Sequence, residues 1–149
     1  MKPVRTKKIM LVEDSPDDQI LIQRGFHKHN IANDFIIVND GVEALDYLFG
    51  TGPQYSEPQP MPQLILLDLK LPRVDGMEVL RQVRENKRTR LVPVVMLTSS
   101  DEENDIVASY QLGANSYVRK PVDFHHFAEA VRQLGMYWLI LNEPPEDNE

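Results

Sequence analysis

Four apolar runs of the chain each end in polar side chains of types that can do chemistry. In chain order, these side chains are Glu13 with Asp14, Asp68, Thr98 and Lys120. Carboxylates bind hard divalent cations and can act as nucleophiles, a lysine supplies a fixed positive charge, and a threonine supplies a hydroxyl donor. Phosphoryl transfer requires little beyond such positioning and charge neutralisation. The set therefore favours phosphoryl-transfer chemistry, provided that the five side chains meet.

Three carboxylates crowded into one pocket would repel one another strongly without a cation. A hard divalent ion such as Mg²⁺ suits oxygen ligands and keeps several of its waters. Bound by Asp14 and Asp68, with Glu13 nearby or acting through water, the ion would neutralise the site and bridge to a phosphate oxygen. Asp68 could then act as the nucleophile and form an acyl phosphate. Lys120 and Thr98 would contact the phosphoryl oxygens.

The order of apolar and amphipathic segments predicts how these side chains are brought together. Short apolar runs alternate with amphipathic stretches, which is typical of a parallel sheet with crossover helices. The carboxyl ends of parallel strands share one edge of the sheet, where such folds bind ligands. The predicted strands cover residues 9–12, 35–38, 64–67, 92–97 and 117–118.

Amphipathic segments between these runs predict five helices. Ser15 caps the first helix, with Pro16 at its first position. Asp40 caps the second, with Glu43 three residues on. The segment 50–62 contains four prolines and is predicted to be a loop. The remaining helices are predicted around residues 79–83, around residues 106–107 and from Asp123 to about Leu141.

Composition indicates one globular domain and excludes several kinds of site. The 149 residues are 42% hydrophobic and 26% charged, which is ordinary for a soluble protein. No apolar run is long enough to span a membrane, and the run 9–12 is too short for a signal peptide, so we expect a cytoplasmic protein. The absence of cysteine excludes disulfides, thiolate zinc sites and cysteine nucleophiles. A net charge of −7 argues against a nucleic-acid surface.

Several short motifs resemble the response-regulator receiver family. They are Glu13-Asp14, the run 67–72 with Asp75-Gly76, Thr98-Ser99 and Lys120-Pro121, in the family's order and at compatible spacings over about residues 7 to 135. The resemblance implies a flavodoxin-like α/β fold, a doubly wound five-stranded parallel sheet in the order 2-1-3-4-5 flanked by five helices. We expect residues 1–149 to form a single receiver domain, with an acidic tail at 142–149 and no output domain, so that output is by protein contact.

The resemblance also assigns a role to each polar residue. It makes Asp68 the phosphoacceptor, and Thr98 with Tyr117 the switch. It implies a cis peptide bond before Pro121, which would aim Lys120 inward. Glutamate at position 13 is a common variant of the aspartate found more often in the family. A Mg²⁺ ion is expected on Glu13, Asp14, Asp68 and the backbone carbonyl of Lys70.

The proline-rich segment 50–62 and the sequence Met136-Tyr137-Trp138 resemble a narrower group, the small phytochrome-associated response regulators of cyanobacteria. This resemblance implies that the phosphodonor is a sensor histidine kinase, of the light-sensing phytochrome kind. The chain would then be a phosphoacceptor signalling protein that promotes only its own phosphorylation and dephosphorylation.

The last predicted helix carries more apolar surface than one sheet edge can cover. A helix of about 19 residues is roughly 28 Å long, and Met136, Tyr137 and Ile140 lie outside its main stripe. We expect a homodimer through this helix and the neighbouring face. The alternative is that these residues fold back onto their own core. The stripe consists of Phe124, Phe127, Val131, Leu134, Trp138 and Leu141.

Three other functions fit parts of the pattern. An aspartyl-phosphate hydrolase of the haloacid dehalogenase kind needs a second carboxylate two residues after its nucleophile, where Lys70 stands here. A degenerate receiver would serve only as a binding module, and the complete set of pocket residues argues against it. A dinucleotide-binding protein would need a glycine-rich phosphate loop after the first strand, which this sequence lacks.

Overall fold

The computed structural model describes residues 8–28, 34–100, 102–120 and 124–143. They form a five-stranded parallel sheet in the order β2-β1-β3-β4-β5, which confirms the predicted fold. The strands are β1 (Ile9–Val12), β2 (Phe35–Val38), β3 (Leu64–Leu67), β4 (Val94–Thr98) and β5 (Ser116–Arg119).

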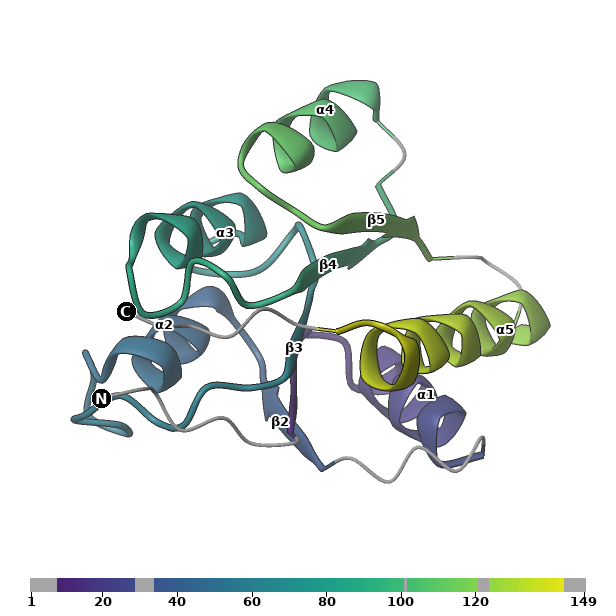
Figure 1. The fold of residues 1–149 in the computed structure, drawn as a ribbon, viewed down its shortest axis with the longest axis horizontal. Helices are drawn as coiled ribbons and strands as arrows, with labels where there is room; N and C mark the ends of the chain where they lie inside the picture. The colour runs from purple at the N-terminus through teal and green to yellow at the C-terminus, as the bar shows by residue number, and fades with distance from the viewer. Residues whose placement is uncertain (1–7, 29–33, 101, 121–123, 144–149) are drawn as a thin grey trace.

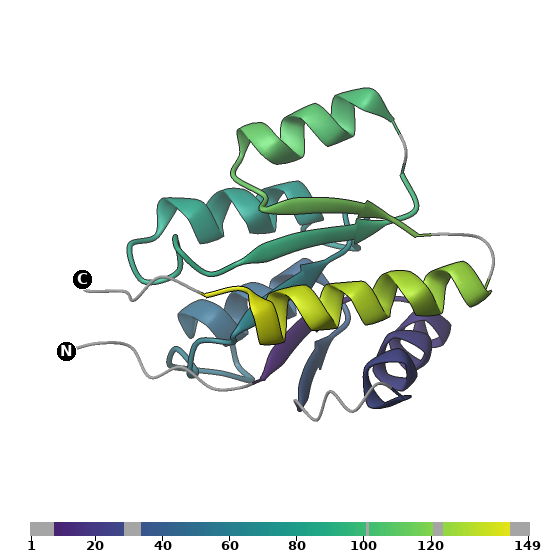
Figure 2. The same ribbon diagram turned by 45° about the vertical axis from the view of Figure 1, so that its right-hand side comes forward.

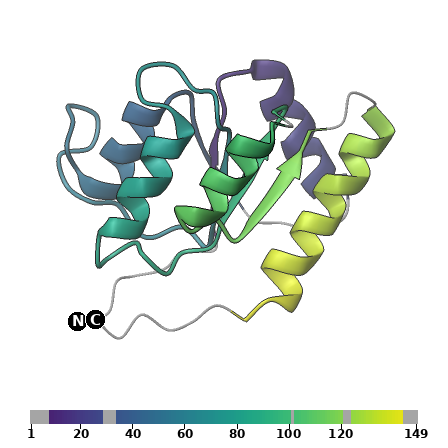
Figure 3. The same ribbon diagram turned by 90° about the horizontal axis from the view of Figure 1, so that it is seen from above.

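Helices cover both faces of the sheet. Helices α1 and α5 lie on one face, and α2, α3 and α4 lie on the other (Figure 1, Figure 2). The view from above shows the latter three side by side (Figure 3). Within the described ranges, every helix is too short or too polar to span a bilayer. The helices are α1 (Pro16–Lys28), α2 (Gly41–Phe49), α3 (Gly76–Glu85), α4 (Glu103–Gln111) and α5 (Phe124–Gly135), the last continuing as a π-helix, η1 (Met136–Leu141).

Strand side chains alternate between two buried cores. Ile9, Leu11, Leu64, Leu66, Val95 and Leu97 pack on the side of α1 and α5. Met10, Val12, Ile65, Leu67, Val94 and Met96 pack on the side of α2, α3 and α4. Continuous apolar runs are what a parallel sheet covered on both faces requires.

Helix starts follow the predicted capping chemistry. The Ser15 hydroxyl accepts a hydrogen bond from the Asp18 amide at 3.3 Å. The Asp40 carboxylate accepts one from the Glu43 amide at 2.9 Å. Both bonds satisfy amides that would otherwise lack partners in a first helical turn.

The fourth strand begins later than the sequence predicted. Val92 was expected to start it, but the Val92 amide donates to the Thr89 carbonyl at 3.1 Å in the preceding turn. Pro93 has no amide to add to the ladder. The strand therefore starts at Val94 and includes Thr98 at its end.

The apolar stripe of the last helix divides between the core and the surface. Leu134 is buried, and Trp138 packs against the core on the α1 side. Leu141, however, is 67% exposed, and Met136 and Tyr137 are also exposed. Leu134 and Trp138 therefore fold back onto the core, as the alternative predicted. Met136, Tyr137 and Leu141 face outward, as the homodimer prediction expected. The side chains of Phe124, Phe127, Val131 and Ile140 lie outside the described residues.

Arg84 of α3 fastens the sheet edge that lies opposite the carboxyl ends of the strands. Its guanidinium donates to the carbonyls of Gly113 and Val92 at 2.8 Å each, and to that of Arg90 at 3.0 Å. It also donates to the Asn115 side chain at 2.8 Å. Burial lowers the pKa of Arg84, and the carbonyl dipoles replace the water that burial removes.

Replacing Arg84 with methionine should destabilise the fold by about 2–4 kcal/mol, because the partly buried carbonyls of Gly113 and Val92 lose their donor. Urea denaturation followed by circular dichroism measures the loss. Arg81→Met is the matched control, because Arg81 lies one turn earlier on α3 and pairs with exposed Glu78 and Glu85, so it should change stability little. Equal losses in the two variants would contradict this role of Arg84.

Candidate functional site

Backbone hydrogen bonds at the strand ends bring the predicted site residues together. The Asp68 amide donates to the Val12 carbonyl at 3.0 Å. Because Glu13 directly follows Val12 in the chain, this bond places Asp68 beside Glu13. The Lys120 amide donates to the Thr98 carbonyl at 2.7 Å, which fixes Lys120 beside the end of β4. Strand register therefore places four separate segments at one edge of the sheet.

Three carboxylates form a cluster at this edge. Glu13, Asp14 and Asp68 each offer an oxygen, and these oxygens lie within 4.8 Å of one another. Glu13 and Asp68 are buried, whereas Asp14 is exposed. Backbone amides hold the buried pair: Ser15 donates to Glu13 at 3.1 Å, and Leu69 donates to Asp68 at 2.7 Å.

This donor set fits a hard divalent cation. All three ligand atoms are carboxylate oxygens, which such cations prefer, and the exposed Asp14 leaves one side open to water. Lys70 lies two residues after Asp68 in the loop that follows β3, and the role of its carbonyl stays a prediction.

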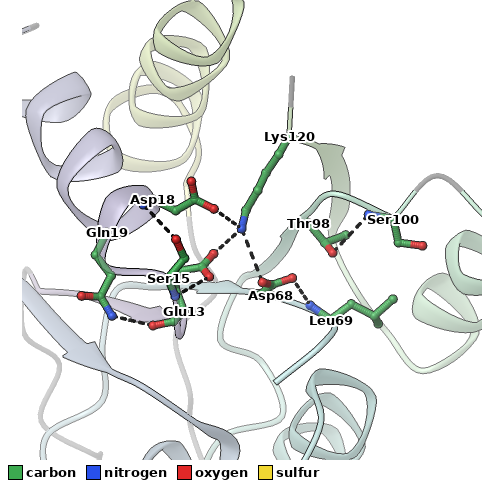
Figure 4. Close-up of polar contacts among 9 residues, drawn as sticks. All are labelled: Glu13, Ser15, Asp18, Gln19, Asp68, Leu69, Thr98, Ser100 and Lys120. Carbon is green, nitrogen blue, oxygen red and sulfur yellow. Dashed lines mark hydrogen bonds and ion pairs between the residues drawn. The ribbon is translucent and has the colours of Figure 1, made fainter. Parts of the chain in front are cut away.

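The Lys120 ammonium lies among the acidic side chains. It bonds to Glu13, to Asp18 at 2.9 Å and to Asp68 at 3.4 Å. Figure 4 shows the lysine reaching from the end of β5 to these three carboxylates. The Lys120 side chain is only 9% exposed, so the ion pairs are shielded from bulk water.

Burial and neighbouring charges shift the pKa values of Glu13 and Lys120. The pKa of Glu13 is raised to about 7: burial is the largest cause, the hydrogen bond from Lys120 opposes it, and the Asp68 charge adds to the rise. Burial alone would lower the pKa of Lys120, but hydrogen bonds to Glu13 and Asp18 and the Asp68 charge raise it above its usual range. Lys120 therefore stays charged, and the carboxylates around it compete for one cation.

The predicted switch residues, Thr98 and Tyr117, lie on β4 and β5. Thr98 is buried and its hydroxyl accepts a weak hydrogen bond from the Ser100 amide at 3.4 Å. The Tyr117 hydroxyl donates to the Ser100 carbonyl at 2.8 Å. Tyr117 is half-buried and packs against the core under α3 and α4. Both switch residues thus contact the segment that leads into α4.

Sequence reasoning missed Asp18 as a partner of Lys120. Asp18 lies in the first turn of α1, where an acidic residue is explained by the helix dipole alone. A usable signal was its place in the first turn of the helix that directly follows Glu13 and Asp14. Gln19 was missed as well; it donates to the Glu13 carbonyl at 2.6 Å and to Asn39 at 2.9 Å. The predicted cis bond before Pro121 lies outside the described residues.

The fold and the acidic edge define a class of protein, and comparison with known families names it. Residues 9–132 match the family described as the response regulator receiver domain. The matched range includes all five residues of the candidate site. The chain therefore belongs to the response regulator receiver family of two-component signalling, as the sequence predicted.

Several of the proteins similar to this chain are phytochrome-associated response regulators. Response regulator Rcp1 of Synechocystis is 41% identical over 133 residues, which cover 89% of each chain. A crystal structure of Mn²⁺-bound Rcp1 has a TM-score of 0.85 and 38% identity, over 94% of this chain and 99% of that one. The phosphorylated cyanobacterial phytochrome response regulator RcpA has a TM-score of 0.85 and 36% identity, over the same shares. The bacteriophytochrome response regulator RtBRR is 50% identical, with a TM-score of 0.72, over 93% of this chain and 84% of that one. These matches confirm the narrower resemblance.

Adding MgCl₂ should stabilise the wild-type protein, because the cation relieves repulsion within the acidic cluster. At a free Mg²⁺ concentration ten times Kd, the gain is about 1.4 kcal/mol, or roughly 3 to 6 °C in Tm. Asp14→Asn should lose this gain and stay folded, since Asp14 is exposed. Differential scanning calorimetry measures both. Asp17→Asn, an exposed acid outside the cluster, is the control and should keep the gain; a gain that survives in Asp14→Asn would contradict the metal site.

Proposed function

We propose that Asp68 accepts a phosphoryl group from a sensor histidine kinase of the phytochrome kind, in a Mg²⁺-dependent reaction. The carrying observation is the position of the Asp68 carboxylate, at 3.4 Å from the Lys120 ammonium and inside a cluster suited to a divalent cation. Similarity to phosphorylated RcpA and to Mn²⁺-bound Rcp1 supports the proposal. Cytoplasmic localisation is part of it, because such kinases draw phosphate from cytoplasmic ATP.

In this reaction an oxygen of Asp68 attacks the phosphorus held on a histidine of the kinase. A phosphorus–oxygen bond forms as the phosphorus–nitrogen bond breaks, and the electron pair returns to the imidazole, which takes up a proton. Lys120 and Thr98 contact the phosphoryl oxygens. Mg²⁺, held by Glu13, Asp14, Asp68 and the Lys70 carbonyl, would supply positive charge to the carboxylates and the phosphoryl oxygens.

Signalling then proceeds through a two-state switch in the same edge. Thr98 moves toward the phosphoryl oxygens, frees space behind it and lets Tyr117 turn inward. The Ser100 segment links the two, because its amide contacts Thr98 and its carbonyl accepts from Tyr117. Their movement repacks the face around α4, which biases the binding of partner proteins.

A homodimer through the last helix and the adjacent face is the second part of the proposal. The outward residues of η1 include Tyr137 and Leu141, which are 50% and 67% exposed. On α4, Val107 and Tyr110 are 44% and 50% exposed. Exposed large apolar side chains such as these favour association.

Treatment with acetyl phosphate and Mg²⁺ should add one phosphoryl group to the wild type and none to Asp68→Asn, as measured by intact mass. EDTA should prevent the gain. If only a cognate kinase can donate, phosphotransfer from a phytochrome kinase to the wild type gives the same result. No gain from either donor would favour a binding module, and sustained hydrolysis of a small phosphate ester would favour a hydrolase.

The wild type should be a dimer at micromolar concentration, and the double variant Tyr137→Glu/Leu141→Glu should be a monomer that is still phosphorylated. Size-exclusion chromatography with light scattering measures the mass in solution. Ile20→Glu is the control, because Ile20 is 47% exposed on α1 and lies outside the proposed interface. A wild-type monomer, with or without phosphorylation, would contradict the dimer.

A further inference from the structure

The loop from Asp68 to α3, residues 69–75, sets the orientation of the candidate phosphoacceptor. The Leu69 amide donates to the Asp68 carboxylate at 2.7 Å. The loop is closed by the Gly76 amide, which donates to the Leu69 carbonyl at 2.8 Å, and contains a bond from Val74 to Pro72 at 2.9 Å. This loop therefore holds the Asp68 carboxylate through the Leu69 amide and also carries the Lys70 carbonyl.

Two glycines let this loop fit between α2 and the end of β3. A Cβ on Gly41, the first residue of α2, would lie 2.0 Å from the Val74 carbonyl oxygen. A Cβ on Gly76 would lie 2.1 Å from the Asp68 carbonyl oxygen. The backbone of Gly41 therefore packs against that of Val74, and the backbone of Gly76 against that of Asp68. A shift of α2 would displace the loop, and with it Asp68, because these close contacts leave little space.

Arg73 occupies an unfavourable backbone conformation at the outer point of this loop. Its φ is 66°, and among the described residues it is the one non-glycine residue with positive φ. A side chain is disfavoured there by contact with the backbone. Such a conformation persists only when other interactions hold it, and it is often found beside functional sites.

The interaction that holds Arg73 is a forked ion pair to Asp40. Nε and Nη2 of Arg73 donate to Oδ2 of Asp40 at 3.1 and 2.9 Å, and Nη2 also donates to Oδ1 at 3.1 Å. The Asp40 side chain is 12% exposed, and its Oδ1 also accepts from the Glu43 amide at 2.9 Å. Asp40 is therefore fixed by the first turn of α2, and it fixes the loop through Arg73.

We propose that the Arg73–Asp40 ion pair is a positioning device, which holds the loop so that Asp68 and the Lys70 carbonyl face a bound divalent cation. Within the described ranges the Arg73 side chain bonds to Asp40 and not to the carboxylate cluster, so it acts through the backbone of residues 69–75. The inference rests on the proposed metal-dependent phosphorylation of Asp68 and adds a residue pair to it.

Two single variants and their combination test the pair. Arg73→Gly removes the guanidinium while suiting the positive φ, and Asp40→Asn keeps a good helix cap while removing the charge. Each should raise the Kd for Mg²⁺ about tenfold in isothermal titration calorimetry, as loss of an outer support does at other metal sites. The double variant should lose no more Mg²⁺ affinity than either single variant, because each single substitution already removes the same ion pair. Phosphorylation by acetyl phosphate should slow at low Mg²⁺ and recover at saturating Mg²⁺.

Amide hydrogen exchange in the metal-free protein gives a readout independent of chemistry at Asp68. The Val74 and Gly76 amides should exchange faster in Arg73→Gly than in the wild type, while amides of β1 and β3 stay unchanged. Arg81→Gln is the matched control, because it removes another exposed arginine–carboxylate fork, on α3, and should alter neither quantity.

Unchanged loop exchange and an unchanged Kd for Mg²⁺ in Arg73→Gly would overturn the inference, and so would an equal loss in Arg81→Gln. Lower thermal stability with an unchanged Kd would overturn it too, since that outcome describes a merely structural ion pair. If Asp68 accepted no phosphoryl group, the proposed function would fail, but exchange and Mg²⁺ binding would still decide on the role of Arg73.

Discussion

The charged edge of the sheet depends on the ion pairs of the Lys120 ammonium. Glu13 and Asp68 are buried carboxylates, and two such charges side by side are tolerated only near a compensating cation. Lys120 supplies it from a third segment, with Asp18 as a further partner. A divalent cation bound to Glu13, Asp14 and Asp68 would take over part of this compensation, which leaves the ammonium able to contact a phosphoryl group.

Sheet order makes this interaction possible. The carboxylates come from the ends of β1 and β3, which are paired, and the ammonium comes from the end of β5, which β4 separates from β3. All the pairings are parallel, so each strand ends at the same edge.

The two edges of the sheet are built differently. At the carboxyl edge, three carboxylates share the single Lys120 ammonium. Close backbone contacts at Gly41 and Gly76 connect α2 and the loop 69–75 to this site. At the opposite edge, Arg84 satisfies four acceptors from the segments around β4 and β5. The opposite edge is therefore suited to stability, and the carboxyl edge keeps an excess of negative charge that a bound divalent cation would balance.

The sequence alone determined the strands, apart from the start of the fourth, together with the helix caps and the convergence of Glu13, Asp14, Asp68, Thr98 and Lys120. Apolar periodicity and capping are local properties, and parallel strands share their carboxyl edge. Only the tertiary structure decided which partners Lys120 and Asp40 take, since Asp18 and Arg73 meet them across 102 and 33 residues of chain. It also decided how the last helix divides, with Trp138 against the core and Leu141 outward. Local pattern places a side chain on a face, but its partner depends on how the elements pack against one another.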